Sequence, residues 1–432
     1  MKRLCWLLLA LVAAPSLAKD KLVILSPHRQ SIQQEFIPAF KKYYEKTYEK
    51  EVDVEWIDQG GTSDDVRFLR ARFANNPKTS GIDLFWGGGS AVFAELAEED
   101  LFAPYTLSDE LQKQVPESAA GIPLYGKNNT WYGSAMSSFG IFYNKRVLAF
   151  DKIPAPKSWE DLAKPAFQGN ISLTDPRRSG SANTMNTIIL QGLGWEKGWE
   201  LLTLIAANAR SFTHSSTDPI KAVVSGDAAV ALAIDFYALA QVGDLGEENL
   251  GFTMPEGQTV LDPDPVAILR GAPNREVAER FVEYSLSAEA QKLLVLPKGA
   301  KDGPRFATLG RMAVNKKTYE LTEGRRTNDF NPFAQKSFMQ LDLEKATKLQ
   351  RVFNDLVGAI LVDTHSDLRQ AWERLIRAKK AEDPQVIAKF VNPPVSEKEF
   401  MEVTANWDNE VFRNKTINSW VQAAKAKYAA AK

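Results

Sequence analysis

Short apolar segments that alternate with helical ones are the feature that most limits how this chain can fold. Residues 22–25 and 229–234 are uninterrupted apolar runs, each as long as a strand buried on both faces of a sheet. Helical periodicity follows such runs, as in the segment that aligns Ala182, Met185 and Ile189. Strands that alternate with helices predict mainly parallel sheets covered by helices, in two α/β lobes.

The pattern predicts strands at residues 22–25, 52–56, 82–86, 139–143, 170–174 and 229–234. A helical stretch is predicted after the first strand, with Ile32, Phe36, Phe40 and Tyr43 near one face and a kink at Pro38, because proline removes a helical hydrogen bond. Beyond about residue 275 the pattern is mostly helical, which predicts a helical C-terminal part.

The composition is that of an ordinary folded protein. The 432 residues include 26 Gly, 22 Pro and one Cys, which excludes collagen-like, disordered and disulfide-framework classes. The formal net charge is −1, so no nucleic-acid partner held by a general basic field is expected. A local basic pocket is compatible with this balance.

The N-terminal residues have the pattern of a secretory signal peptide. Two basic residues precede an apolar run at 4–14 that is too short to span a bilayer, and Ser16-Leu17-Ala18 is an A-x-A-like cleavage site. We expect residues 1–18 to be removed, and Cys5, the only cysteine, with them. An exported chain of this length without cysteine favours a bacterial periplasmic protein. Cys5 is not at the cleavage point and no later apolar run is long enough to cross a membrane, so no membrane anchor is expected.

Polar and glycine-rich segments follow several of the predicted strands. Because ligands of open α/β sheets bind beyond the carboxyl ends of strands, these segments are expected to converge on one cleft. Each segment alone is weak evidence, since glycine turns after strands are common. The candidate ligand-binding residues are Ser26, His28, Gly61, Thr62, Ser63, Gly89, Ser90, Ser138, Asp175, Arg177, Arg178, Ser179, Gly180, Ser181, His214, Asp235 and Tyr237.

The segment 174–181 carries the strongest of these signals. A strand delivers Arg177, Arg178 and two serines to the start of a helix whose first turn contains no acid. Free N–H groups, the positive end of the helix dipole and guanidinium groups all favour an anion there. The alternative is that a serine only caps the helix and both arginines face solvent.

The similar turn at Gly60 to Ser63 is followed directly by Asp64 and Asp65. These acids would satisfy the helix start themselves and repel an anion, or would accept hydrogen bonds from ligand hydroxyl groups. This segment therefore predicts either a capped helix or a polar wall of the cleft.

Five stretches of sequence form a further pattern. They are GIFYNK at 140–145, SWEDL at 158–162, TDPRRSGS at 174–181, VSGDAAV at 224–230, and RGAPN at 270–274 followed by SLSAEAQ at 285–291. Together they resemble the bacterial extracellular solute-binding proteins of ABC importers, in the branch that binds ferric ion, phosphonates or sugar phosphates. The resemblance extends to about residue 295.

The resemblance implies an α/β, two-lobe periplasmic-binding-protein fold of type II, in which crossover strands act as a hinge and the lobes close on a ligand. The crossings are expected near residues 130–140 and 236–245. The implied division is a signal peptide at 1–18, a first lobe at 19–132 and 246–432 that includes a helical C-terminal extension, and a second lobe at 133–245.

Ferric members of this family bind their cation with two adjacent tyrosines, and the position expected to align with them has Asp235-Phe236-Tyr237. A phenylalanine cannot ligate iron, so the resemblance favours a small organic anion: a phosphorylated sugar, a phosphonate or a related phosphate ester. Asp235 is then expected to bind hydroxyl or amino groups of the ligand, and the 177–181 loop its phosphate. Neither a metal ion nor a cofactor is expected.

The predicted function is that of a non-catalytic periplasmic receptor that passes its ligand to an ABC permease in the inner membrane. The alternatives are a ferric-ion carrier, a sensory receptor that reports to a membrane kinase, and a phosphate-ester hydrolase that uses Asp175 or His28 with a metal. No H-E-x-x-H, G-x-S-x-G or P-loop motif is present, so no enzymatic activity is predicted.

Overall fold

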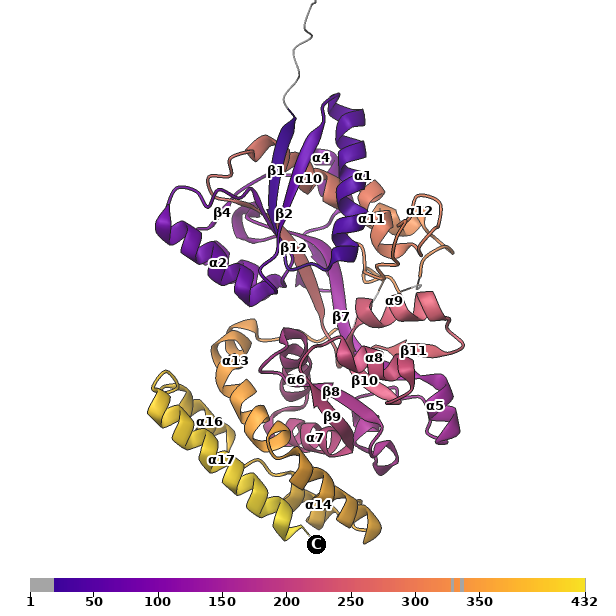
Figure 1. Cartoon of the computed structure of the whole chain (residues 1–432), viewed down its shortest axis with the longest axis vertical. Helices are drawn as coiled ribbons and strands as arrows, with labels where there is room; N and C mark the ends of the chain where they lie inside the picture. The colour runs from indigo at the N-terminus through magenta and orange to yellow at the C-terminus, as the bar shows by residue number, and fades with distance from the viewer. Residues whose placement is uncertain (1–18, 328–329, 335–337, 432) are drawn as a thin grey trace, which may run out of the picture.

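Two α/β lobes, joined by strands that run from one into the other, make up the molecule (Figure 1). The computed structural model describes residues 19–327, 330–334 and 338–431, so the predicted signal peptide at 1–18 lies outside the described residues. No helix of the described part is long and apolar enough to cross a membrane.

The first lobe is built on three parallel strands. Strand β1 (Asp20–Leu25) pairs in parallel with β2 (Val52–Ile57) and with β3 (Leu84–Trp86). The helices of this lobe are α1 (Gln30–Tyr48), α2 (Thr62–Asn75), α3 (Ser90–Glu98), α4 (Asp109–Gln114), α10 (Arg275–Leu286), α11 (Ala288–Val295) and α12 (Lys316–Leu321). Short strands β4 (Phe102–Ala103), β5 (Ser118–Ala119) and β6 (Ile122–Pro123) complete it. Helix α1 contains Pro38 and extends to Tyr48, beyond Tyr43, the last residue of the aligned apolar face.

The second lobe repeats the parallel arrangement. Strand β8 (Ile171–Thr174) pairs in parallel with β9 (Ala209–Thr213) and β10 (Val230–Ile234). The helices of this lobe are α5 (Lys145–Phe150), α6 (Gly180–Leu193), α7 (Trp195–Asn208), α8 (Asp218–Ser225) and α9 (Asp235–Leu245).

Two long strands connect the lobes and run antiparallel to their neighbours. Strand β7 (Tyr132–Asn144) pairs with β12 (Leu261–Leu269) through its first half, and with β10 and β11 (Leu250–Thr253) through its second half. The sheet is therefore mixed, whereas mainly parallel sheets were expected; the antiparallel pairs are those made by the connecting strands. The expected crossing at 130–140 lies within β7.

The second crossing lies later in the chain than expected. Residues 236–245 form helix α9 of the second lobe, and the chain returns to the first lobe between β11 and β12, after Thr253. Thr259 marks this return: its hydroxyl donates to the carbonyl of Phe139 over 2.6 Å. The chain crosses again near residues 338–339, because Phe338 packs on the core of the first lobe and Met339 on that of the second.

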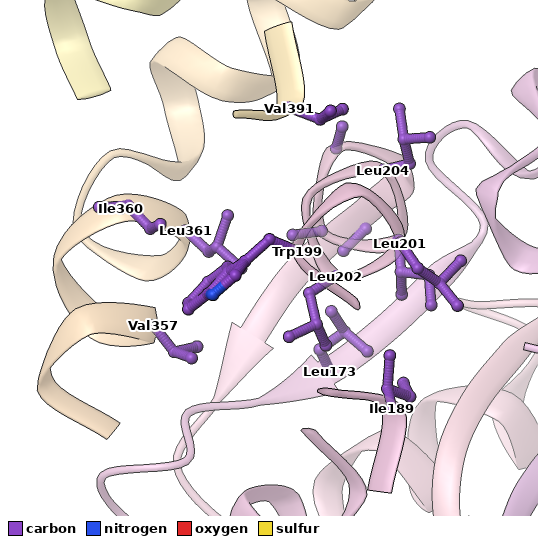
Figure 2. Packing of buried hydrophobic residues seen from close by; sticks show 14 of the residues in the cluster. Leu173, Ile189, Trp199, Leu201, Leu202, Leu204, Val357, Ile360, Leu361 and Val391 are labelled. Carbon is purple, nitrogen blue, oxygen red and sulfur yellow. The ribbon is translucent and has the colours of Figure 1, made fainter. Parts of the chain in front are cut away.

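The C-terminal helices pack on the second lobe, whereas the sequence analysis assigned them to the first. They are α13 (Leu343–Val357), a π-helical turn (Gly358–Val362), α14 (His365–Arg377), α15 (Pro384–Val391), α16 (Glu397–Thr404) and α17 (Glu410–Ala430). Figure 2 shows Val357, Ile360 and Leu361 packed around Trp199 of α7, which is fully buried. Helix α7 has apolar residues on most of its sides, and the C-terminal helices pack in the same core and bury part of this surface.

Candidate functional site

A cleft of about 1150 Å³ lies between the two lobes. The first lobe lines it with the turns after β1, β2 and β3, with β12 and with residues 308–311, and the second lobe with the starts of α6 and α9 and the loop after β9. The C-terminal part adds Gln340, Leu341, Ala346 and Gln350. The polar segments that follow separate strands thus converge on one cleft.

Most of the residues predicted from the sequence line this cleft. They are His28, Gly61, Thr62, Ser63, Gly89, Ser90, Arg178, Ser179, Gly180, Ser181, His214 and Tyr237. The others lie beside or beneath it: Ser26, Ser138, Asp175, Arg177 and Asp235 are absent from the lining.

The loop between β8 and α6 has an internal ion pair that fixes its shape. The Arg177 guanidinium donates to Asp175 over 2.8–3.1 Å and, on its other edge, to Asp363 of the C-terminal part over 2.8–3.0 Å. Gly358 makes room for it, because a Cβ there would lie 2.6 Å from Arg177 Nε. Arg177 and Asp175 therefore hold the loop in place and do not line the cleft, although both were predicted to bind the ligand. Asp363 is too distant in sequence to have been foreseen.

The rest of this loop faces the cleft. Ser179 is the N-cap of α6, since its Oγ accepts the N–H of Ala182 over 3.2 Å, so the capping role foreseen as the alternative is real for this serine. The N–H groups of Gly180 and Ser181 lie in the first turn of α6, so no carbonyl group within the helix can accept a hydrogen bond from them. Arg178 is exposed and takes part in no ion pair within the described part of the chain. Arg178 and the start of α6, with its two uncompensated N–H groups at the positive end of the helix, thus line the same cleft.

The turn at Gly60 to Ser63 is not capped by the acids that follow it. Helix α2 has no side-chain cap; Asp65 is fully buried and accepts the N–H of Gln59 over 2.9 Å, and Asp64 pairs with Arg67. Burial raises the pKa of Asp65 to about 7. Thr62 and Ser63 are consequently available to the cleft, as a polar wall.

On the first lobe, His28 belongs to a buried charge cluster. Its Nε2 lies 2.6 Å from Asp264 Oδ2, and Arg311 Nη1 donates to the same oxygen. Ser26, which is fully buried, holds the other ring nitrogen of His28 at 3.0 Å. Gly87 is required here, with φ of 93° and a Cβ that would lie 2.6 Å from the imidazole. Burial alone would raise the pKa of Asp264, but the charges of Arg311 and His28 hold it well below its usual range.

Two arginine–aromatic contacts join the lobes across the cleft. The guanidinium carbon of Arg29 lies 3.4 Å from the ring centre of Tyr237, and that of Arg311 lies 4.2 Å from the ring centre of Phe236. Both aromatic residues are on α9 of the second lobe, whereas both arginines belong to the first. Cation–π attraction therefore favours the approach of the lobes that this structure has.

Ser138 and Asp235 lie at the hinge and not in the cleft. Ser138 is fully buried in β7, where its Oγ is 3.3 Å from Thr259 Oγ1. Asp235 is 1 % exposed, accepts the N–H of Phe236 over 2.7 Å, and has a second oxygen without a partner. Burial raises its pKa to about 7. Asp235 cannot bind ligand hydroxyl groups from this position, so that prediction is wrong.

Two carboxylates of β12 were missed by the sequence analysis. Asp262 lines the cleft and accepts hydrogen bonds from Ser90, from the N–H over 3.2 Å and from Oγ over 2.7 Å. Asp264 is the acid of the charge cluster described above. Residues two apart on a strand share a face, so the repeat Asp-Pro-Asp-Pro was the available signal.

Comparison with known proteins agrees with this geometry. Residues 79–304, more than half of the chain, match the family of bacterial extracellular solute-binding proteins. The chain belongs to this family. The predicted function as the substrate-binding component of an ABC transporter is thereby confirmed, and with it the extracellular or periplasmic class of protein. The family is one of binding proteins and not of enzymes.

The chain is also similar to individual members of this solute-binding class. The phosphoglycerate transport regulatory protein PgtC of Salmonella typhimurium is 28 % identical over 324 residues, 72 % of each chain. The sugar-phosphate-bound AfuA of Actinobacillus pleuropneumoniae, solved with fructose 6-phosphate, has a TM-score of 0.59 at 21 % identity over 83 % of this chain and 98 % of its own. Iron-bound HitA of Pseudomonas aeruginosa has a TM-score of 0.56 at 20 % identity over 77 % of this chain and 98 % of its own. The two structural similarities show the fold alone.

Proposed function

We propose that this protein captures a small organic anion, a phosphate ester or phosphonate, between its lobes in the periplasm and delivers it to an ABC permease of the inner membrane. The observation that carries the proposal is Arg178, which faces the cleft without an ion-pair partner in the described part of the chain, beside the free N–H groups at the start of α6. A phosphate oxygen is the acceptor that such donors bind most strongly. The phosphoglycerate in the name of one relative and the fructose 6-phosphate bound to one structural neighbour are both phosphate esters.

The test is native mass spectrometry of freshly purified protein, followed by calorimetric titration. We expect a bound compound whose fragments contain phosphate or phosphonate, because a site closed between two lobes releases a tight ligand slowly. After its removal, titration with glycerol 3-phosphate should give saturable one-to-one binding, and glycerol should give none. A co-purified compound without an anionic group, or tighter binding of glycerol than of its phosphate, would contradict the proposal.

Ferric ion is the competing ligand, and the aromatic pair on α9 argues against it. We expect ferric citrate to give no phenolate-to-iron absorption band in the visible, because Phe236 has no oxygen and Tyr237 stacks on Arg29. Absorbance titration measures this, with Phe236→Tyr as the matched variant that restores the adjacent pair. A strong band stoichiometric with the unmodified protein would overturn the choice of an organic anion.

A sensory role is the second candidate, favoured by the name of the relative PgtC, a transport regulatory protein. Both roles need the same ligand and differ in the partner. A deletion strain that expresses the transporter genes from an inducible promoter separates them. Loss of labelled-ligand uptake in that strain supports delivery to a permease, and normal uptake supports sensing.

The periplasmic location makes a prediction about the mature chain. If residues 1–18 are a signal peptide, protein recovered from the periplasm should begin at Lys19. N-terminal sequencing checks this directly. Periplasmic protein that still began at Met1 would exclude cleavage at the proposed site.

A further inference from the structure

Asp262 lines the cleft and has one carboxylate oxygen available. Its Oδ1 accepts both hydrogen bonds from Ser90. Its Oδ2 has no hydrogen-bond partner among the described residues and is not fully buried. Gly89 keeps this oxygen uncovered, since a Cβ at that position would lie 3.1 Å from it.

No cation of the described part neutralises this carboxylate. Arg311, the buried arginine of this lobe, is engaged with Asp264 and His28. Burial, with a smaller contribution from the neighbouring charge of Asp264, raises the pKa of Asp262 to about 6. The carboxylate is therefore ionised at neutral pH and held in a position where its charge is poorly solvated, so a donor from the ligand would stabilise it.

The two walls of the cleft present complementary groups among their polar residues, although the first lobe also contributes Arg29 and Arg67 to the lining. The second lobe presents Arg178 and the N–H groups of α6, which are donors only, and the first lobe presents Asp262, which when ionised is an acceptor only. A ligand that satisfies both walls carries an anionic group at one end and a hydroxyl or ammonium group at the other. A second carboxylate placed against Asp262 would be repelled.

We propose that Asp262 is the residue that selects the non-phosphate end of the ligand, by accepting a hydrogen bond from a hydroxyl or ammonium group through Oδ2. This rests on the proposed function, because it takes the anionic end to lie on the 178–181 segment. It assigns the ligand to the phosphate esters of polyols or amino alcohols. Asp262 has the role that the sequence analysis expected of Asp235, which is buried at the hinge.

The experiment compares three small esters that share the phosphate and differ at the other end: phosphoethanolamine, glycerol 3-phosphate and n-propyl phosphate. Calorimetry at pH 8 measures their dissociation constants for the unmodified protein, for Asp262→Asn, and for Glu95→Gln. The last is a matched control, since Glu95 also lines the cleft but is already paired with Arg70 over 2.6 Å.

We expect the unmodified protein and Glu95→Gln to prefer phosphoethanolamine to propyl phosphate by about 10- to 150-fold, the factor of one hydrogen bond to a charged group. Asp262→Asn should abolish this preference and leave propyl phosphate unchanged. Glycerol 3-phosphate should weaken less, because an amide still hydrogen-bonds a hydroxyl group. The melting temperature of the ligand-free variant separates this effect from a change in folding.

The outcomes distinguish the two proposals. If the three esters bind the unmodified protein equally, or if Asp262→Asn weakens all three by the same factor, the role of Asp262 is overturned and the anionic ligand stands. If none of the esters binds, the proposed function and the role of Asp262 are both overturned.

Discussion

Replacing Arg178 by glutamine should weaken the binding of a phosphate ester by about 10- to 150-fold, the cost of one charge-assisted hydrogen bond lost from a closed site. The guanidinium has no ion-pair partner in the described part of the chain that would compete with a ligand, and it stands beside the uncompensated N–H groups of Gly180 and Ser181. Calorimetric titration with glycerol 3-phosphate measures the loss. The stability of the ligand-free protein should change by no more than about 0.5 kcal/mol, because the side chain is exposed and unpaired.

Two variants make this prediction specific. Arg67→Gln removes a charge from the opposite wall of the same cleft, but Arg67 is paired with Asp64, so affinity should change by less than about threefold. Ser179→Ala should act mainly on stability, costing about 0.5–2 kcal/mol through the lost helix cap. Equal affinities for the Arg178 variant and the unmodified protein would place the anion elsewhere, at His28 and Arg29 of the first lobe.

The sequence predicts the cleft better than it predicts the role of each residue in it. Polar turns after strands must gather at one edge of a sheet, so the segments at 61–63, 89–90 and 178–181 converge as expected. What a side chain does there depends on partners far away in sequence. Arg177 and Arg178 are neighbouring residues of the same type, but Arg177 pairs with Asp363, whereas Arg178 lines the cleft.

The errors in the fold have a similar origin. Strand β12 contains two prolines, which in sequence argue against a central strand, and its register shifts between Asp264 and Pro265. Because β12 was not predicted from the sequence, the second crossing was expected within α9, and Asp262 and Asp264 were not recognised as candidate site residues. The C-terminal helices are amphipathic whichever lobe they cover, so periodicity identifies them as helices without saying where they pack. They pack on the second lobe because the apolar surface of α7 is buried against them there.

The largest effect on stability is expected at Asp264, because it is the counter-ion of the buried Arg311 and a hydrogen-bond partner of His28. Asp264→Asn should cost about 3–5 kcal/mol of unfolding free energy, since it leaves the Arg311 guanidinium, 7 % exposed, without its counter-ion. Urea unfolding of ligand-free protein at pH 7 measures it. The double change Asp264→Asn with Arg311→Met should cost less than the sum of the two single changes, because it leaves no unpaired charge. Additive losses would show that the pair is not energetically coupled.

The difference in unfolding free energy between the unmodified protein and Asp264→Asn should also depend on pH, and the pKa of Asp264 sets the direction. The folded-state pKa of Asp264 lies below its unfolded value of about 3.9, because Arg311 and His28 outweigh the effect of burial, so its stabilisation is complete above that value. It should be lost as the pH falls below about 4. Asp65, Asp235 and Asp262 act in the opposite direction: burial raises the pKa of the first two to about 7 and of the third to about 6, so each adds stability as the pH falls from 7 towards 4. The contributions of Asp65 and Asp235 cancel when Asp264→Asn is subtracted from the unmodified protein, whereas that of Asp262 does not, because the charge of Asp264 helps to raise its pKa. The difference should therefore shrink as the pH falls below about 4, and a difference that kept its size in that acid range would mean that an ionised Asp264 is not its source.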